Sequence, residues 1–199
     1  MGKVKVALII GTGAYLGSAI ARRFAKEGFH AVGTRRRGDI ASFVKEIEDS
    51  GGKATGMHSD ARKEEQVVEL VERVENEIGP IEVFVFNIGG NVMFSILDTT
   101  TRVYTKVWEM CALADFLTGR EVARRMVSRK RGTMLFTGAT ASVRGSNGFS
   151  AFAGGKHALR ALAQSMAKEL MPQNIHVAHV IIDGPIDTEW TRQRFPEMV

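Results

Sequence analysis

Cysteine is nearly absent from this 199-residue chain, in which Cys111 is the only one. One cysteine cannot form an internal disulfide, and no spacing of cysteine and histidine resembles a zinc site. We therefore expect neither a disulfide framework nor a bound metal. A chain with so little cysteine suits a reducing compartment, so we expect a cytoplasmic protein.

Long hydrophobic runs are also missing, since none approaches the roughly 18 apolar residues that a membrane span needs. The first ten residues show no cleavable signal pattern, and we expect no membrane partner. Hydrophobic residues make up 44% of the chain and charged residues 25%, an ordinary balance for a globular protein. The length suffices for one α/β core, so we expect a single domain over residues 1–199.

Acidic residues are fewer than basic ones, and the formal net charge is +5. A positive charge favours phosphorylated ligands in general, without distinguishing nucleotides from nucleic acids or anionic membranes. Two basic runs, TRRRGD at 34–39 and SRKRG at 128–132, contain neither interleaved aromatic residues nor a nucleic-acid motif. We expect no nucleic-acid partner, and we place the second run at a helix C-terminus, where cations suit the helix dipole.

Short β-rich runs alternate with longer amphipathic segments along the chain. The expected strands are 4–10, 30–34, 53–58, 83–86, 133–137 and 175–182. The expected helices are 16–27, 63–78, 102–128 and 151–170. Several strands are apolar on both faces, which suits a parallel sheet covered on both sides. We expect a doubly wound, Rossmann-like α/β fold, in which ligands bind at the carboxyl ends of the strands.

A glycine-rich loop, GTGAYLG at 11–17, joins the first strand to the first helix. Such a loop presents free backbone N–H groups and a helix N-terminus to a phosphate. Gly11 can make the turn, and Gly17 can let the helix pack close to the strand. The position favours dinucleotide binding over the alternative of a merely tight turn.

Two arginines, Arg35 and Arg36, follow the second strand. NAD sites usually place an acidic residue there for the ribose 2′-OH, whereas NADP sites tend to use arginine against the 2′-phosphate. These residues favour NADP(H) over NAD(H). The alternative is a solvated basic turn.

Taken with FAGGK at 152–156, these loops resemble the short-chain dehydrogenase/reductase family across nearly the whole chain. GTGAYLG is similar to the family's G-x-x-x-G-x-G loop, and Asp60 matches an acidic residue used near the adenine. FNIGG at 86–90 resembles the Asn-Asn-Ala-Gly segment, and DGPIDT at 183–188 resembles the Pro-Gly…Thr segment. The resemblance implies hydride transfer on an alcohol/carbonyl pair with a nicotinamide cofactor. The cofactor-binding residues that it implies are Gly11, Gly13, Tyr15, Leu16, Gly17, Arg35, Arg36, Asp60, Ala61, Asn87, Gly89, Lys156, Gly184 and Thr188.

Only one of the family's four catalytic groups is present at its matching position. In the family a tyrosine is the general acid/base, a serine thirteen residues earlier holds the substrate oxygen, and an asparagine completes a proton relay. Phe152, Ala139 and Cys111 occupy these three positions, whereas Lys156 matches the lysine that binds the nicotinamide ribose and lowers the tyrosine pKa. We expect a degenerate site with inefficient turnover, because loss of a general acid/base typically lowers rates about 10²- to 10⁴-fold.

Three hydroxyls lie near the lost groups, on Thr140, Ser142 and Ser150. Each could substitute, and so could a water on Lys156, but each is also an ordinary loop or N-cap residue. Tyr15 stands where the family has its middle glycine, so its ring either covers the cofactor, weakens binding or turns outward. A non-catalytic cofactor-binding or regulatory module on the same fold is the alternative function.

Partners and substrate are less defined by the sequence. The resemblance implies a homo-oligomer through helices 102–128 and 151–170. An apolar small-molecule substrate is suggested by loop residues that could equally be simple packing. These residues are Met93, Phe94, Val143, Phe149 and Trp190. Family members usually continue into a seventh strand, whereas Val199 falls inside the substrate loop. If 199 residues is the natural length, we expect the sixth strand to be a sheet edge beside an open pocket. A naturally short chain, a fragment and a splice product stay open.

Overall fold

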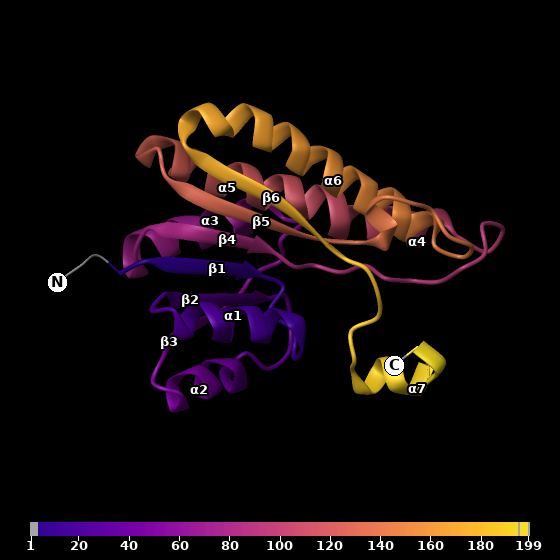
Figure 1. The fold of residues 1–199 in the computed structure, drawn as a ribbon, viewed down its shortest axis with the longest axis horizontal. Coiled ribbons are helices and arrows are strands. Elements are labelled where there is room, and N and C mark those ends of the chain that lie inside the picture. The colour runs from indigo at the N-terminus through magenta and orange to yellow at the C-terminus, as the bar shows by residue number, and fades with distance from the viewer. Residues whose placement is uncertain (1–3, 195, 199) are drawn as a thin grey trace.

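Six parallel strands form the centre of the molecule (Figure 1). The computed structural model describes residues 4–194 and 196–198. The strands are β1 (Val6–Ile10), β2 (His30–Arg35), β3 (Lys53–His58), β4 (Ile81–Phe86), β5 (Gly132–Ala139) and β6 (Ile175–Ile182). Their order across the sheet is β3-β2-β1-β4-β5-β6. The expected doubly wound α/β fold is therefore confirmed.

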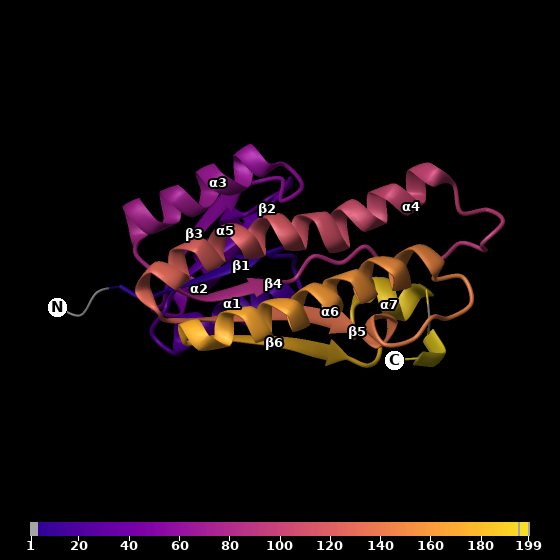
Figure 2. The same cartoon turned by 90° about the horizontal axis from the view of Figure 1, so that it is seen from above.

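Helices cover both faces of this sheet (Figures 1 and 2). One face carries α1 (Leu16–Lys26) and α2 (Ala41–Asp49), whose apolar side chains pack on Ala7, Ile9 and Val85. The other face carries α3 (Glu64–Arg73), α5 (Ala114–Arg129) and α6 (Ser150–Leu170). Strands β1 and β4 are buried on both faces, which explains why every residue of β1 and every residue of β4 except Glu82 is apolar.

Two helices depart from regular α geometry. A π-helical segment, Val74–Ile78, follows α3, and another, Glu109–Leu113, lies between α4 (Thr101–Trp108) and α5. The expected helix 102–128 is thus one nearly continuous rod with a π-helical segment that contains Cys111. Segments of this kind often occur at functional sites.

Helix α2 was not predicted. Its apolar pattern is short: Phe43 and Ile47 are buried one turn apart, and Val44 packs partly buried beside them. A short helix with only one such pair gives a weak periodic signal. The predicted position of the second basic run is correct, because α5 ends at Arg129, where the guanidinium pairs with Glu75.

The sheet places the site by its topology. The chain leaves β1 toward β2 on one side and later returns to β4 on the other, so a crevice opens at the carboxyl ends of β1 and β4. The loops after β5 and β6 lie at the same edge, because all six strands are parallel. Strand β6 pairs with β5 alone within the described residues. A search of the described helices finds none that is long and apolar enough to span a membrane.

Candidate functional site

A cavity of about 650 Å³ lies at the carboxyl ends of the strands. Its wall is formed by the first residue of α1, by the ends of β5 and β6 and the segments after β4, β5 and β6, and by the first turns of α6. Its apolar side chains include Leu16, Ile88, Met93, Phe149, Phe152 and Ile182. Met93 and Phe149 thus lie where a pocket role predicts them, whereas Phe94 and Val143 are over 40% exposed and do not line the cavity. The side chain of Trp190 is outside the described residues.

The glycine loop contains a row of backbone N–H groups that donate no hydrogen bond to any described residue. The backbone N–H groups of residues 14–17 have no hydrogen-bond acceptor among the described residues, and they precede or open α1. A Cβ on Gly17 would lie 2.3 Å from the Gly11 carbonyl oxygen, so only glycine permits this close contact of loop and helix. Gly11 has a φ of +92°, in the region that favours glycine, and its carbonyl accepts a hydrogen bond of 3.1 Å from Asn87 Nδ2. Free amides at a helix N-terminus fit a phosphate group.

Arg35 lies directly beside this loop. Its Nε donates to the Thr12 carbonyl at 3.0 Å, and its Nη1 donates to the Asp39 carbonyl. Arg36 is exposed next to it. The structure therefore brings the two predicted arginines to the edge of the glycine loop, where they leave positive charge facing solvent.

Asp60 is bound to a partner that sequence reasoning missed. Arg62 forms a bidentate pair with it, with donor–acceptor distances of 2.8 and 2.6 Å. These hydrogen bonds lower the pKa of Asp60 to about 2. The side chain of Ala61 is buried, and its backbone N–H has no acceptor within the described part of the chain. The short spacing of Asp60 and Arg62 is the signal that could have indicated the pair.

Lys156 is buried, with only 3% of its surface exposed. Its ammonium donates to the Thr137 carbonyl at 2.8 Å and to the Ile88 carbonyl at 3.2 Å, and it lines the cavity. Burial lowers the pKa of this lysine. Lys156 is therefore not an ordinary solvated lysine on a helix surface. An ammonium has three donors, so one remains for a ligand.

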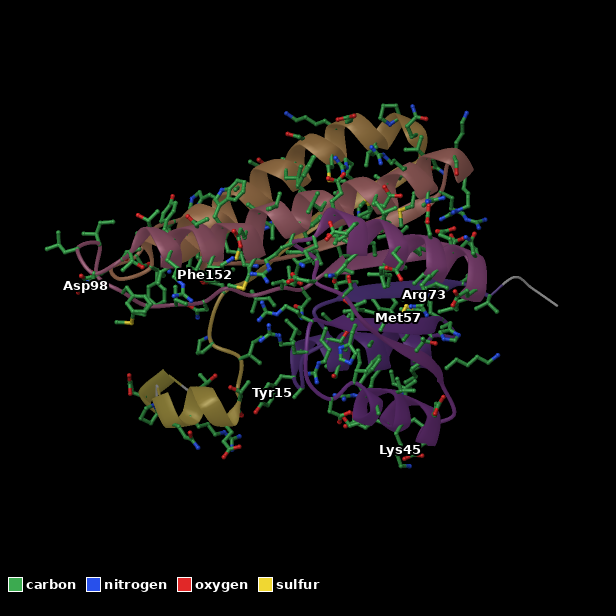
Figure 3. All side chains as sticks on the ribbon, turned by 180° about the vertical axis from the view of Figure 1, so that it is seen from behind. Tyr15, Lys45, Met57, Arg73, Asp98 and Phe152 are labelled. Atoms are coloured by element: carbon green, nitrogen blue, oxygen red, sulfur yellow. The ribbon has the colours of Figure 1, made fainter. Side chains whose placement is uncertain are left out.

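The three other predicted positions differ in their relation to the cavity. Phe152 and Ala139 line it, and the Phe152 ring centroid lies 6.0 Å from Lys156 Nζ. Figure 3 shows Phe152 near the end of α6 where the cavity opens. Cys111 is fully buried behind the wall, where burial raises the pKa of its thiol, and a Cβ on Gly155 would lie 2.8 Å from its Cβ. Cys111 is thus a packed helix residue and not an exposed nucleophile.

The neighbouring hydroxyls are mostly engaged in local bonds. Thr140 Oγ1 lines the cavity and donates to Asp183, and Ser142 Oγ accepts from the Ala139 N–H at 3.0 Å. Ser150 is the first residue of α6, and Phe149 is its cap residue, so of the alternatives for Ser150 the N-cap does not apply. The Ser150 hydroxyl is buried and makes no hydrogen bond to any described residue.

The remaining predicted residues surround the same crevice. Asn87, Gly89, Gly184 and Thr188 all line the cavity. Thr188 begins α7 (Glu189–Arg194), where its Oγ1 accepts from the Thr191 N–H at 3.0 Å. A Cβ on Gly13 would meet no atom within 4 Å. The Tyr15 side chain is 48% exposed and extends toward the side on which α7 lies (Figure 3).

A doubly wound sheet with a free-amide glycine loop at its switch point defines a nucleotide-binding α/β protein. The family model for short chain dehydrogenases matches residues 5–198. The chain therefore belongs to the short-chain dehydrogenase/reductase family of NAD(P)-dependent oxidoreductases.

Similar proteins agree with this assignment. A 2-dehydro-3-deoxy-D-gluconate 5-dehydrogenase of Formosa agariphila is 31% identical over 88% of this chain and 67% of its own. Human dehydrogenase/reductase SDR family member 4 is 32% identical over 94% of this chain and 68% of its own. A crystal structure of a short-chain dehydrogenase from Rhodopseudomonas palustris has a TM-score of 0.87 and 51% identity, covering 91% of this chain and 85% of that one.

Proposed function

We propose that this protein binds NADP(H) in the crevice. We also propose that it slowly transfers hydride between this cofactor and an apolar small molecule with an activated carbonyl or alcohol group. The observation that carries the proposal is the buried Lys156, which has one uncommitted donor in a cavity that also borders the first turn of α1. The nicotinamide supplies or accepts the hydride when it is bound. The protein's own residues bind, orient and shield the reactants.

The cofactor contacts follow from the donors available. The amides of residues 14–17 would bind the pyrophosphate, and Arg35 with Arg36 would bind the 2′-phosphate. Asp60 and Ala61 would lie at the adenine, and Lys156 would donate to the nicotinamide ribose. The rest of the proposed cofactor site is formed by Gly11, Gly13, Tyr15, Leu16, Gly17, Asn87, Gly89, Gly184 and Thr188.

Slow turnover is proposed because the cavity lacks the family's proton donor. Phe152 has no hydroxyl, Ala139 cannot hold a substrate oxygen, and Cys111 is buried and does not line the cavity. Thr140 has a hydroxyl and lines the cavity, but an alcohol is a far weaker acid than a lysine-assisted phenol. We expect a rate about 10²- to 10⁴-fold below that of a member with the tyrosine.

The test compares the natural chain with Phe152→Tyr/Ala139→Ser. Titration of NADPH and NADH by fluorescence measures binding, and a panel of carbonyl compounds measures turnover. We expect tight NADPH binding in both proteins and a rate increase of at least about tenfold in the double variant. Efficient turnover by the natural chain would contradict the degenerate site, and failure to bind either nucleotide would contradict the cofactor proposal itself. NADPH binding with no turnover in either protein would favour a non-catalytic binding module.

Self-association is the second part of the proposal. Tyr104, Trp108 and Phe116 recur at multiples of four residues along α4 and α5, and each is more than 40% exposed. A row of exposed aromatic side chains on one rod suits contact with another protein surface. We propose that this row, together with α6, joins two copies of the chain.

A further inference from the structure

Asp115 is the residue whose position the proposed function leaves unexplained. It lies in the first turn of α5, its side chain is fully buried, and neither carboxyl oxygen has a hydrogen-bond partner among the described residues. The two other buried carboxylates, Glu82 and Glu121, are both ion-paired with arginine. A buried carboxyl without any partner is costly unless a nearby charge compensates it.

Helices α5 and α6 lie side by side on the same face of the sheet (Figure 2). Cys111 lies one turn before it and touches Gly155, since a Cβ there would be 2.8 Å from the Cys111 Cβ. Gly119 lies one turn after it and faces Met166 and Phe136. Residues four apart share one face of a helix, so Asp115 lies in the interface of α5 with α6 and β5.

Lys156 is the matching unpaired charge in this interior. It directly follows Gly155, it is the only buried lysine or arginine among the residues whose side chains the structure describes, and its two hydrogen bonds go to backbone carbonyls rather than to a carboxylate. Burial raises the pKa of Asp115 well above its ordinary value, and the positive charge of Lys156 opposes this rise. Burial lowers the pKa of Lys156, and Cys111 and Asp115 oppose that change. Each group therefore stabilises the charged form of the other.

We propose that Asp115 is the buried counter-charge that keeps Lys156 protonated, so that the lysine retains a third donor for the cofactor ribose. The inference rests on the proposed function for the role of that donor. A neutral amine has two N–H donors, and the carbonyls of Thr137 and Ile88 would occupy both. In the family's usual site a phenolate lies beside the lysine, whereas Phe152 carries no charge. Asp115 is thus a positioning residue, because it acts through Lys156 and does not line the cavity.

Two further titratable groups face this pair. Cys111 lies one turn before Asp115, and burial raises the pKa of its thiol. His179 on β6 lies near Gly138, and burial, Arg160 and Lys156 lower the pKa of its ring. His179 is therefore neutral at alkaline pH, and Cys111→Ser removes the thiol, so the contribution of Asp115 can be isolated.

The first test measures NADPH affinity against pH for the natural chain and for Asp115→Asn. We expect the ratio of the two dissociation constants to rise with pH and to reach about tenfold at about pH 9, since one lost hydrogen bond corresponds to roughly that factor. Glu121→Gln is the matched control, because it removes a buried, ion-paired carboxylate from the same helix. Glu121→Gln should leave the pH profile unchanged, and Asp115→Asn should have the same effect in a Cys111→Ser background, which lacks the thiol that also acts on Lys156. A ratio for Asp115→Asn that does not depend on pH would overturn the proposal.

The second test needs no cofactor. The ¹³Cε signal of Lys156, assigned by its loss in Lys156→Met, should titrate at lower pH in Asp115→Asn than in the natural chain. An unchanged midpoint would overturn the inference. Absence of NADPH binding by the natural chain would refute the proposed function, while this titration would still decide whether the two charges are coupled.

A double-mutant cycle covers the case in which Asp115→Asn does not fold. At about pH 8, Lys156→Met leaves Asp115 without a counter-charge, so the melting temperature of this variant should fall below that of the natural chain. Adding Asp115→Asn to this variant should restore much of the lost stability. Burial raises the pKa of Asp115, and loss of the ammonium would raise it further, so the fall in melting temperature in Lys156→Met should increase as pH rises through the raised pKa of Asp115 in the natural chain. Independent, additive effects of the two substitutions would contradict the coupling.

Discussion

At the scale of single residues, Arg35 and Arg36 determine the proposed preference for NADPH over NADH. Replacing both with alanine should weaken NADPH binding about ten- to hundredfold and NADH binding far less, because charged hydrogen bonds to the 2′-phosphate would be lost. Fluorescence titration with the two nucleotides measures the difference. Arg22→Ala is the control, since Arg22 is a surface arginine of α1 that pairs with Glu46. Equal losses for both nucleotides would refute the assignment of the 2′-phosphate site.

Residues also show where the sequence could predict the site and where it could not. Lys156 was predictable because a helical position four residues after Phe152 matches a family motif, and the structure places it in the cavity. Asp115 was not predictable, because a charged residue in an amphipathic helix usually lies on the solvated face. Its burial depends on the close contact of Cys111 with Gly155, which joins segments more than 40 residues apart. Sequence patterns report local periodicity and do not report such crossings.

At the scale of elements, the position of α1 against the glycine loop depends on Gly17. A Cβ there would lie 2.3 Å from the Gly11 carbonyl oxygen, so Gly17→Ala should displace the helix from the loop. We expect the melting temperature to fall by about 2 to 10 °C, since overpacking costs about 1–3 kcal/mol in a chain of this size, and we expect weaker NADPH binding. Gly145→Ala is the control, because a Cβ at Gly145 would meet no atom within 4 Å. Calorimetry that finds the two variants equally stable would contradict this account.

Most elements were predictable to within about two residues, and the exceptions have physical causes. Strands β3 and β6 have the predicted bounds, since apolar runs end at turn residues. Helix α2 was missed because its buried face is short and contains few apolar residues, namely Phe43, Val44 and Ile47. The π-helical segments were missed because they continue the apolar pattern of the helices around them. The tertiary structure, and not the local sequence, sets where each helix changes its geometry.

At the scale of the whole molecule, the row formed by Tyr104, Trp108 and Phe116 predicts that the chain self-associates. Size-exclusion chromatography with light scattering should give a mass that is a multiple of 21.8 kDa. Trp108→Glu/Phe116→Glu should shift the mass to one chain, because two like charges would face each other across a desolvated contact. Leu97→Glu is the control, since Leu97 is 94% exposed in the loop before α4 and lies outside the row. A monomeric natural chain, or an equal shift in Leu97→Glu, would show that the row is not an interface between copies.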